Sequence, residues 1–155
     1  MTPEEAKTTL QVVHAKCLVG RKIPQDLKRR HKDWSPCLLS PLKPVKSGGC
    51  IQVSCGQETK KTLTSLILLA SGTTSRPKEL QASHLCGKSN CANSAHIILE
   101  NSKKNNQRKN CRGYIRIPRR AIHVRTASRR RSRLIFQRRR WVSACNHDPH
   151  CIVFD

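Results

Sequence analysis

The chain contains 155 residues, which is long enough for one domain and too short for two. Hydrophobic residues make up 36% and aromatic residues 3%, against roughly 45–50% apolar residues, glycine included, in an ordinary domain, so we expect a thin core. The 31 Lys and Arg residues against nine Asp and Glu residues give a formal charge of +22, which indicates a polyanion-binding protein and makes nucleic acid the expected partner. The longest strongly apolar run, residues 63–70, is too short to cross a bilayer, so we expect a soluble protein without a membrane partner.

The first part of the chain predicts one helix and then a β-hairpin. Residues 1–33 are polar and favour a short helix over residues 3–14, but they indicate no role. Residues 50–55 alternate apolar and polar side chains as a strand does, and residues 56–58 form a turn. Residues 60–64, with their threonines, then form the returning strand.

The middle of the chain predicts a helix, a metal-bearing hairpin and a second helix. The apolar run is ambiguous between a strand and a buried helix, and we favour a helix that ends at Gly72. Residues 82–99 suit a strand, a metal-held loop and a second strand. Asn101 or Ser102 can then cap a helix over residues 103–110.

An arginine-rich segment follows at residues 112–144, with twelve arginines and no acidic residue. It has no regular hydrophobic period, so it predicts a flexible insertion or linker. A charge run of this kind is as often a solvated face as a binding surface, yet it adds nonspecific affinity for phosphate either way. We therefore divide the chain into an N-terminal segment, a core, this insertion and a C-terminal segment, at residues 1–33, 34–111, 112–144 and 145–155.

Two groups of cysteine and histidine residues have the spacing of zinc ligands. The first is a Cys-x4-Cys-x4-His set, and the second is a Cys-x-His-x3-Cys set that an upstream cysteine can complete. Cysteines beside histidines, and an N-terminus without an apolar leader, favour metal-bound thiolates in a reducing compartment over disulfides. We expect two structural zinc sites on which the fold depends. Their residues are Cys86, Cys91 and His96 in the first group, and Cys111, Cys145, His147 and Cys151 in the second.

Two further residues have the chemistry of a metal-assisted hydrolytic site. His84 precedes Cys86 by two residues and is surplus to a four-ligand zinc site, and a histidine of ordinary pKa, near 6.5, can act as a general base. Asn105 offers a hard amide oxygen that suits Mg²⁺, and it shares one helix face with Lys109. The alternatives are a structural histidine and a surface amide.

These motifs together resemble a known family. The run ASHLC-x4-C-x4-H, then N-x5-C, then C-x-H-x3-C, is similar to the His-Cys box homing endonucleases, a branch of the ββα-metal (His-Me finger) nucleases. The resemblance covers about residues 37–111 and 145–151 and implies a small, zinc-stapled α+β fold with an antiparallel DNA-binding hairpin. It also implies that Cys37 is the fourth ligand of the first zinc; Cys50 is the rival, but Cys37 keeps the family's register through Gly72.

The resemblance implies a Mg²⁺-dependent, sequence-specific double-strand DNA endonuclease of the homing type, acting as a homodimer. In that family the histidine matching His84 deprotonates the attacking water, and the asparagine matching Asn105 holds Mg²⁺ at the scissile phosphate. The products carry a 5′-phosphate and a 3′-hydroxyl, and the cofactors are two structural Zn²⁺ and one catalytic Mg²⁺. The DNA-binding residues expected in the hairpin are Gln52, Gln57, Lys60 and Lys61.

The sequence also departs from the family. Gln57 occupies the position of an arginine that contacts the cleaved phosphate. Nearby Lys60 or Lys61 can supply the charge, but lysine lacks the bidentate fork of arginine. This departure leaves open a noncatalytic zinc protein that binds DNA or RNA, and the positive charge alone leaves open a structural ribonucleoprotein component. Basic runs at residues 129–131 and 138–140 favour a nuclear location.

Overall fold

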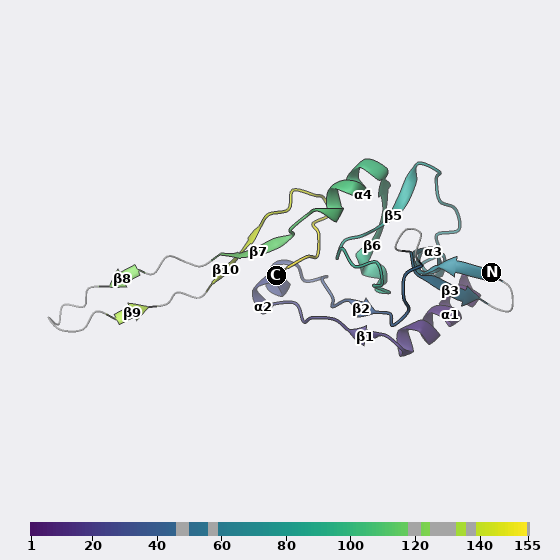
Figure 1. Cartoon of the computed structure of the whole chain (residues 1–155), viewed down its shortest axis with the longest axis horizontal. Helices are drawn as coiled ribbons and strands as arrows, with labels where there is room; N and C mark the ends of the chain where they lie inside the picture. Colours follow the sequence, from purple (N-terminus) through teal and green to yellow (C-terminus); the bar gives the residue numbers. More distant parts are fainter. Residues whose placement is uncertain (46–49, 56–58, 118–121, 125–132, 136–138, 155) are drawn as a thin grey trace.

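The structure of the chain is a computed structural model, and it describes residues 1–45, 50–55, 59–117, 122–124, 133–135 and 139–154. Within these residues it is an α+β protein with four α-helices and five two-stranded antiparallel sheets (Figure 1). Because the sheets described have only two strands each, none of them can bury a wide face, and the hydrophobic core is divided into small clusters.

The largest cluster forms where α1 (Pro3–Ala15) packs against α3 (Leu63–Ala70). A capping box between Thr2 and Glu5 begins α1. Helix α3 confirms the predicted helix, and Gly72 follows it at φ +87°, a conformation that favours glycine. The N-terminal segment therefore contributes core residues, a role that its sequence did not indicate: Ala6, Leu10 and Val13.

The predicted hairpin is formed by β3 (Gln52–Cys55) and β4 (Thr59–Thr62). Val53 and Cys55 are buried and their neighbours along β3 are exposed, which is the period of two that the sequence shows. A second short pair, β1 (Leu18–Val19) with β2 (Leu38–Leu39), lies beside α2 (Gln25–Arg30) in the N-terminal third of the chain (Figure 1).

The ββα unit follows as predicted. Strand β5 (Leu80–His84) pairs with β6 (Ile97–Asn101) in a register that places His84 opposite Ile97. The loop between them contains the 3-10 helix η1 (Ser94–His96). Asn101 ends β6 and accepts a hydrogen bond from the backbone N–H of Lys104 (2.9 Å), so Asn101 is the cap of α4 (Ser102–Lys109).

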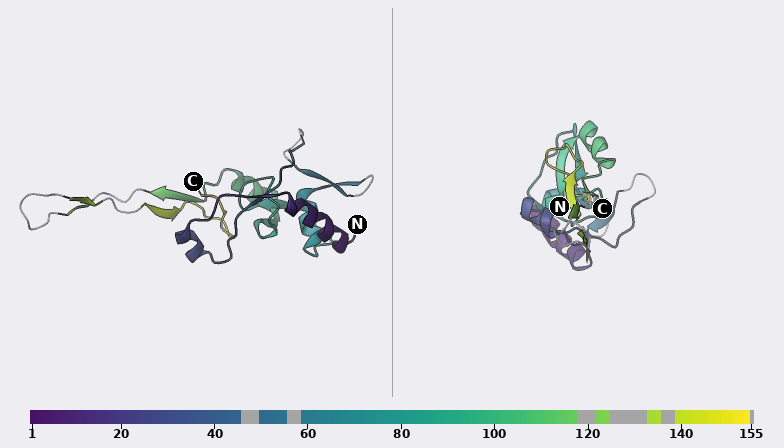
Figure 2. Two further views of the ribbon diagram at one scale, coloured as in Figure 1. Left: turned by 90° about the horizontal axis from the view of Figure 1, so that it is seen from below. Right: turned by 90° about the vertical axis from the view of Figure 1, so that its left-hand side faces the viewer.

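The arginine-rich segment contains strands that its sequence does not indicate. In the part that the structure describes, it contains β7 (Tyr114–Ile117) paired with β10 (Arg140–Ser143), and β8 (Ile122–Val124) paired with β9 (Arg133–Ile135). These strands project from the body as a two-stranded ribbon (Figures 1 and 2). The sequence predicts a flexible insertion or linker here and indicates no strands, because the pairing that holds these residues is between strands and no local period reveals it.

Candidate metal and nuclease site

The four residues expected at the first zinc site lie together, with their ligand atoms all within 4.8 Å of one another. His96 Nδ1 is 3.4 Å from Cys91 Sγ and 3.7 Å from Cys37 Sγ. Zn–S bonds of about 2.3 Å and Zn–N bonds of about 2.0–2.1 Å in a tetrahedron separate the ligands by about 3.4–3.8 Å. The donor set therefore fits zinc in both chemistry and spacing, and its residues are Cys37, Cys86, Cys91 and His96.

Cys37 reaches this cluster because β2, which follows it, docks on the zinc loop. Leu39 forms an antiparallel bridge with Cys91, and the backbone N–H of Ala92 donates to the carbonyl of Leu38 (2.7 Å). Cys50, the rival ligand, is exposed and lies outside the cluster. The structure thus brings Cys37 to the site by pairing between segments about fifty residues apart.

The orientation of the His96 ring is set from its other side. His96 is fully buried, and its Nε2 lies 2.9 Å from the carbonyl oxygen of Ser35. A ring N–H that donates to this carbonyl leaves Nδ1 unprotonated and directed at the thiols, which is the usual outer support of a zinc-bound histidine.

The second expected cluster is also assembled, from residues on both sides of the ribbon. His147 Nδ1 lies 3.4 Å from Cys145 Sγ and 3.6 Å from Cys151 Sγ, so its spacing again matches a tetrahedral zinc site. Burial opposes ionisation of Cys145, but hydrogen bonds from the backbone N–H groups of Cys151 and His147 outweigh it and lower the pKa of Cys145 to about 6. A thiolate is the form that binds zinc. The members of the cluster are Cys111, Cys145, His147 and Cys151.

A buried ion pair joins this second cluster to the ββα unit. Arg108 Nε donates to both carboxylate oxygens of Glu100 at 2.9 Å, and both side chains are at most 5% exposed. The same guanidinium donates to the carbonyl of Pro149 (2.7 Å) and to Cys151 Sγ (3.4 Å). Helix α4 is therefore fixed to β6 at one side and to the zinc-ligand loop at the other.

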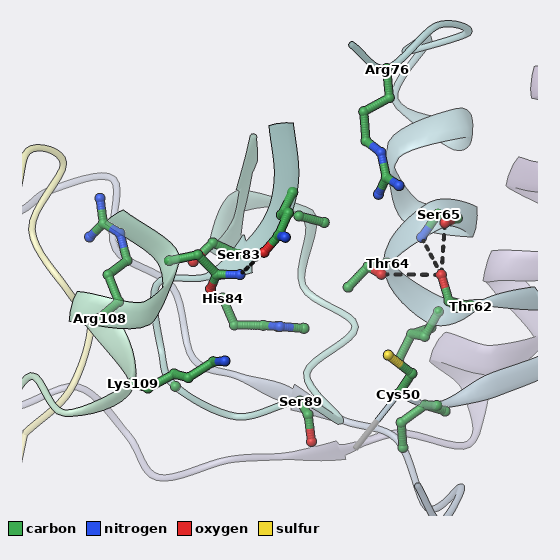
Figure 3. A pocket seen from close by; sticks show the side chains of 16 residues that line it. Cys50, Thr62, Thr64, Ser65, Arg76, Ser83, His84, Ser89, Arg108 and Lys109 are labelled. Atoms are coloured by element: carbon green, nitrogen blue, oxygen red, sulfur yellow. Dashed lines mark hydrogen bonds between the residues drawn. The ribbon is translucent and has the colours of Figure 1, made fainter. Parts of the chain in front are cut away.

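His84 and Asn105 both line one cleft of about 570 Å³, which has walls from β5, α3, α4 and the first zinc loop. Strand β5 ends at His84, and Asn105 closes the first turn of α4. The ring of His84 points into the cleft (Figure 3). The ββα unit thus brings to a single cavity two residues that are 21 positions apart in the sequence.

The environment of His84 favours a neutral imidazole. Burial is the main cause of the lowering of its pKa below 6.5; Cys91 acts in the opposite direction, and His96 adds to the lowering. Its Nε2 is buried and has no hydrogen-bond partner among the described residues. An unpaired buried nitrogen is costly unless it serves a ligand or a water, and a neutral one can accept a proton from it.

The amide of Asn105 is oriented by its neighbour on β5. Asn105 Nδ2 donates to Gln81 Oε1 (3.0 Å), and within the described residues the amide oxygen of Asn105 accepts no hydrogen bond. Because the nitrogen end of the amide is occupied, the oxygen end remains for a cation. The donor chemistry therefore fits Mg²⁺, which binds oxygen ligands and uses few protein side chains.

Besides Arg108, which is paired with Glu100, two cationic side chains line the cleft. Lys109 comes from the face of α4 that carries Asn105, as their spacing of four residues predicts. Arg76 comes from the segment after α3 and is directed toward the cleft (Figure 3). Sequence reasoning missed Arg76 and Gln81, because only the packing of α3 and β5 brings them to the cavity.

The structure separates the residues expected to bind DNA in the hairpin. Gln52 and Lys60 are exposed on one face of the β3–β4 pair, together with Ser54, which is the cross-strand partner of Lys60. Lys61 lies opposite buried Val53 on the other face and is half-buried. Gln57 lies outside the described residues.

Comparison with known proteins identifies one matching family. The family model described as the zinc-binding loop region of homing endonuclease matches residues 51–154, about two thirds of the chain. The chain belongs to the homing endonuclease zinc-binding loop family. No curated protein and no solved structure matches it.

The match to the homing endonuclease family includes seven of the eight cluster residues and both His84 and Asn105; Cys37 precedes the matched range. Membership indicates a nuclease, hence a hydrolase, with DNA as its substrate. Among the described residues no helix is long and apolar enough to span a membrane.

Proposed function

We propose that this protein is a Mg²⁺-dependent, sequence-specific endonuclease of the homing type that hydrolyses both strands of duplex DNA. The observation that carries the proposal is the cleft that His84 and Asn105 share. Membership of the homing endonuclease family supports a nuclease, and the shared cleft supports the residue roles proposed below.

His84 is the general base. Its neutral, unpaired imidazole accepts a proton from the water that attacks phosphorus. The first Cys/His cluster holds the ring in place, since Cys86 follows His84 by two residues and the N–H of Leu85 donates to the carbonyl of His96 (2.8 Å).

Asn105 is the residue that would hold Mg²⁺, with its amide oriented by Gln81. When bound, the cation supplies Lewis acidity and stabilises the leaving 3′ oxygen. Arg76 and Lys109 place positive charge along the cleft and position the scissile phosphate. Attack on phosphorus with departure of the 3′ oxygen leaves a 5′-phosphate and a 3′-hydroxyl.

The test is cleavage of a randomised library of duplex targets with Mg²⁺ by the natural protein and by His84→Ala. We expect the substitution to lower the rate by about 10²–10⁴-fold, the contribution of a general base, while zinc content and circular dichroism stay unchanged. Gln11→Ala, an exposed change on α1, is the control and retains activity. Equal cleavage by the natural protein and His84→Ala would show that His84 is not the general base.

The second candidate function is noncatalytic binding of DNA or RNA. Its motivation is Gln57 at the position where the family carries an arginine. Strong, salt-dependent binding without Mg²⁺-dependent nicking of any duplex in the library would favour this function over the enzyme.

We further propose that the protein acts in the nucleus and as a homodimer, which would present one cleft to each DNA strand. The basic runs of the sequence motivate the location. Exclusion of a fluorescent fusion from the nucleus would contradict the first proposal, and a monomer mass in sedimentation on DNA would contradict the second.

A further inference from the structure

The ribbon of β7 and β10 is anchored firmly at its base. Tyr114 is 4% exposed and Trp141 is 8% exposed, and both pack with Leu27 of α2. The Tyr114 hydroxyl lies 2.6 Å from His31 Nε2, and Trp141 meets Phe154 edge to face at 6.1 Å. Aromatic side chains that bury this much area fix the direction in which the ribbon leaves the body.

The second Cys/His cluster closes the same base. Cys111 precedes β7 by three residues and Cys145 follows β10 by two, so one metal site joins both ends of the ribbon. Gly113, at φ +60°, lets the chain pass so near Val153 that a Cβ at this position would collide with the Val153 carbonyl oxygen. The ribbon is therefore firmly attached to the body at its base, and we call residues 112–144 the arm.

The arm carries positive charge that nothing described neutralises. Four of its arginines have a described exposure; all four are exposed, and none of them forms an ion pair with another described residue. The Arg116 guanidinium lies 5.9 Å from the centroid of the Trp141 ring, which leaves its donors available at the edge of the arm. The four are Arg112, Arg116, Arg139 and Arg140.

We propose that this arm is a second duplex-binding element, which lies along DNA beyond the cleft and binds its phosphates. The inference rests on the proposed function for the choice of duplex DNA. Strand β7 begins five residues after Lys109, which lines the cleft, so the arm continues from the helix that meets the scissile phosphate. A two-stranded ribbon fits a DNA groove, and twelve arginines without an acid match the charge of its backbone.

The first test shortens the arm. Residues 118–139 are replaced by Asn-Gly, which joins the cross-strand partners Ile117 and Arg140 and removes nine of the twelve arginines. Binding to a fluorescent duplex of arbitrary sequence is followed against NaCl without added Mg²⁺. We expect the slope of log K against log[salt] to fall by about 3 or more, since each lost phosphate contact contributes about 0.9, with two zinc ions retained.

The second test uses point changes that leave the chain length intact. Arg116→Gln combined with Arg140→Gln is expected to lower the slope by about 1.8. Arg21→Gln with Lys22→Gln, an exposed pair of equal charge outside the arm, is the control and leaves the slope unchanged.

The outcomes separate this inference from the proposed function. An unchanged slope for both arm variants on duplex DNA overturns the inference, whatever the nuclease assay gives. A loss confined to RNA probes overturns it too, because the arm would then serve another nucleic acid. If the arm variants lower the slope on duplex DNA but the natural protein never cleaves, the inference about the arm stands and the proposed nuclease activity is contradicted.

Discussion

At the scale of single residues, the cleft depends on how one amide is held. Asn105 presents its oxygen because its nitrogen donates to Gln81, so Gln81 acts as a positioning residue. We expect Gln81→Ala to weaken the apparent affinity for Mg²⁺ by about 10–100-fold, as outer-shell changes do, while the rate at saturating Mg²⁺ changes little. A Mg²⁺ titration of cleavage measures both quantities, and an unaltered midpoint would show that Asn105 needs no support.

Arg76 carries the second residue-scale prediction. Its guanidinium is directed at the cleft, and the family's hairpin arginine is replaced here by Gln57. If Arg76 supplies the missing charge, Arg76→Gln lowers kcat by about 10²–10³-fold, the effect of removing one transition-state donor. Single-turnover cleavage measures it, with Lys78→Gln on the same segment as the control. A loss in KM alone would place Arg76 in DNA binding instead.

Sequence reasoning at this scale succeeded where chemistry is local and failed where packing decides. Zinc ligands separated by four residues are fixed by the loop between them, so Cys86, Cys91 and His96 were recognisable from spacing. Arg76 and Gln81 have no such signature. Their position in the cleft follows from the placement of α3 and β5, which no short window of sequence encodes.

At the scale of elements, the Glu100–Arg108 pair fixes α4 between β6 and the second cluster. Glu100→Gln would leave a buried guanidinium without its carboxylate, and we expect a loss of about 3–5 kcal/mol in unfolding free energy. Glu4→Gln breaks an exposed pair with Lys7, so this control costs about 0–1 kcal/mol. Urea unfolding of both variants measures the two losses. Similar midpoints would show that the Glu100–Arg108 pair does not stabilise the fold.

The elements themselves were partly predictable. Helices α1, α3 and α4 and both hairpins of residues 50–101 carry caps, turns and periods that act within a few residues. Strands β7 and β10 pair across 22 intervening residues, and their faces mix Arg116 with Trp141 rather than alternating polar and apolar groups. That mixture hides the period of two, which is why the sequence of this segment predicts no strands.

At the scale of the whole molecule, the N-terminal segment is part of the fold. Leu10 is 8% exposed and packs in the cluster that α1 shares with α3. We expect Leu10→Ala to cost about 2–5 kcal/mol, as for a core leucine, whereas Val12→Ala at a 56% exposed position of the same helix costs little. Thermal unfolding of the two variants checks this, and equal melting temperatures would show that residues 1–33 are dispensable to the core.

The two Cys/His clusters are linked to each other, so we expect the fold to depend on zinc at both of them together. The N–H of Ile152, next to Cys151, donates to the carbonyl of Leu85, next to Cys86, at 2.7 Å. Because the described hydrophobic clusters are small, metal binding on the order of 10 kcal/mol is comparable with the entire stability of a domain. Loss of either zinc should therefore disorder both sites.

This dependence predicts about two zinc ions per chain and cooperative unfolding when a chelator removes them. Cys91→Ser, which replaces a buried ligand, is expected to lower the zinc content and abolish the folded state at 25 °C. Cys50→Ser changes an exposed thiol outside both clusters and keeps two zinc ions, so it controls for the loss of a cysteine. Metal analysis and circular dichroism measure the two outcomes together. A protein that stays folded after both zinc ions are removed would show that hydrophobic packing alone supports the cleft.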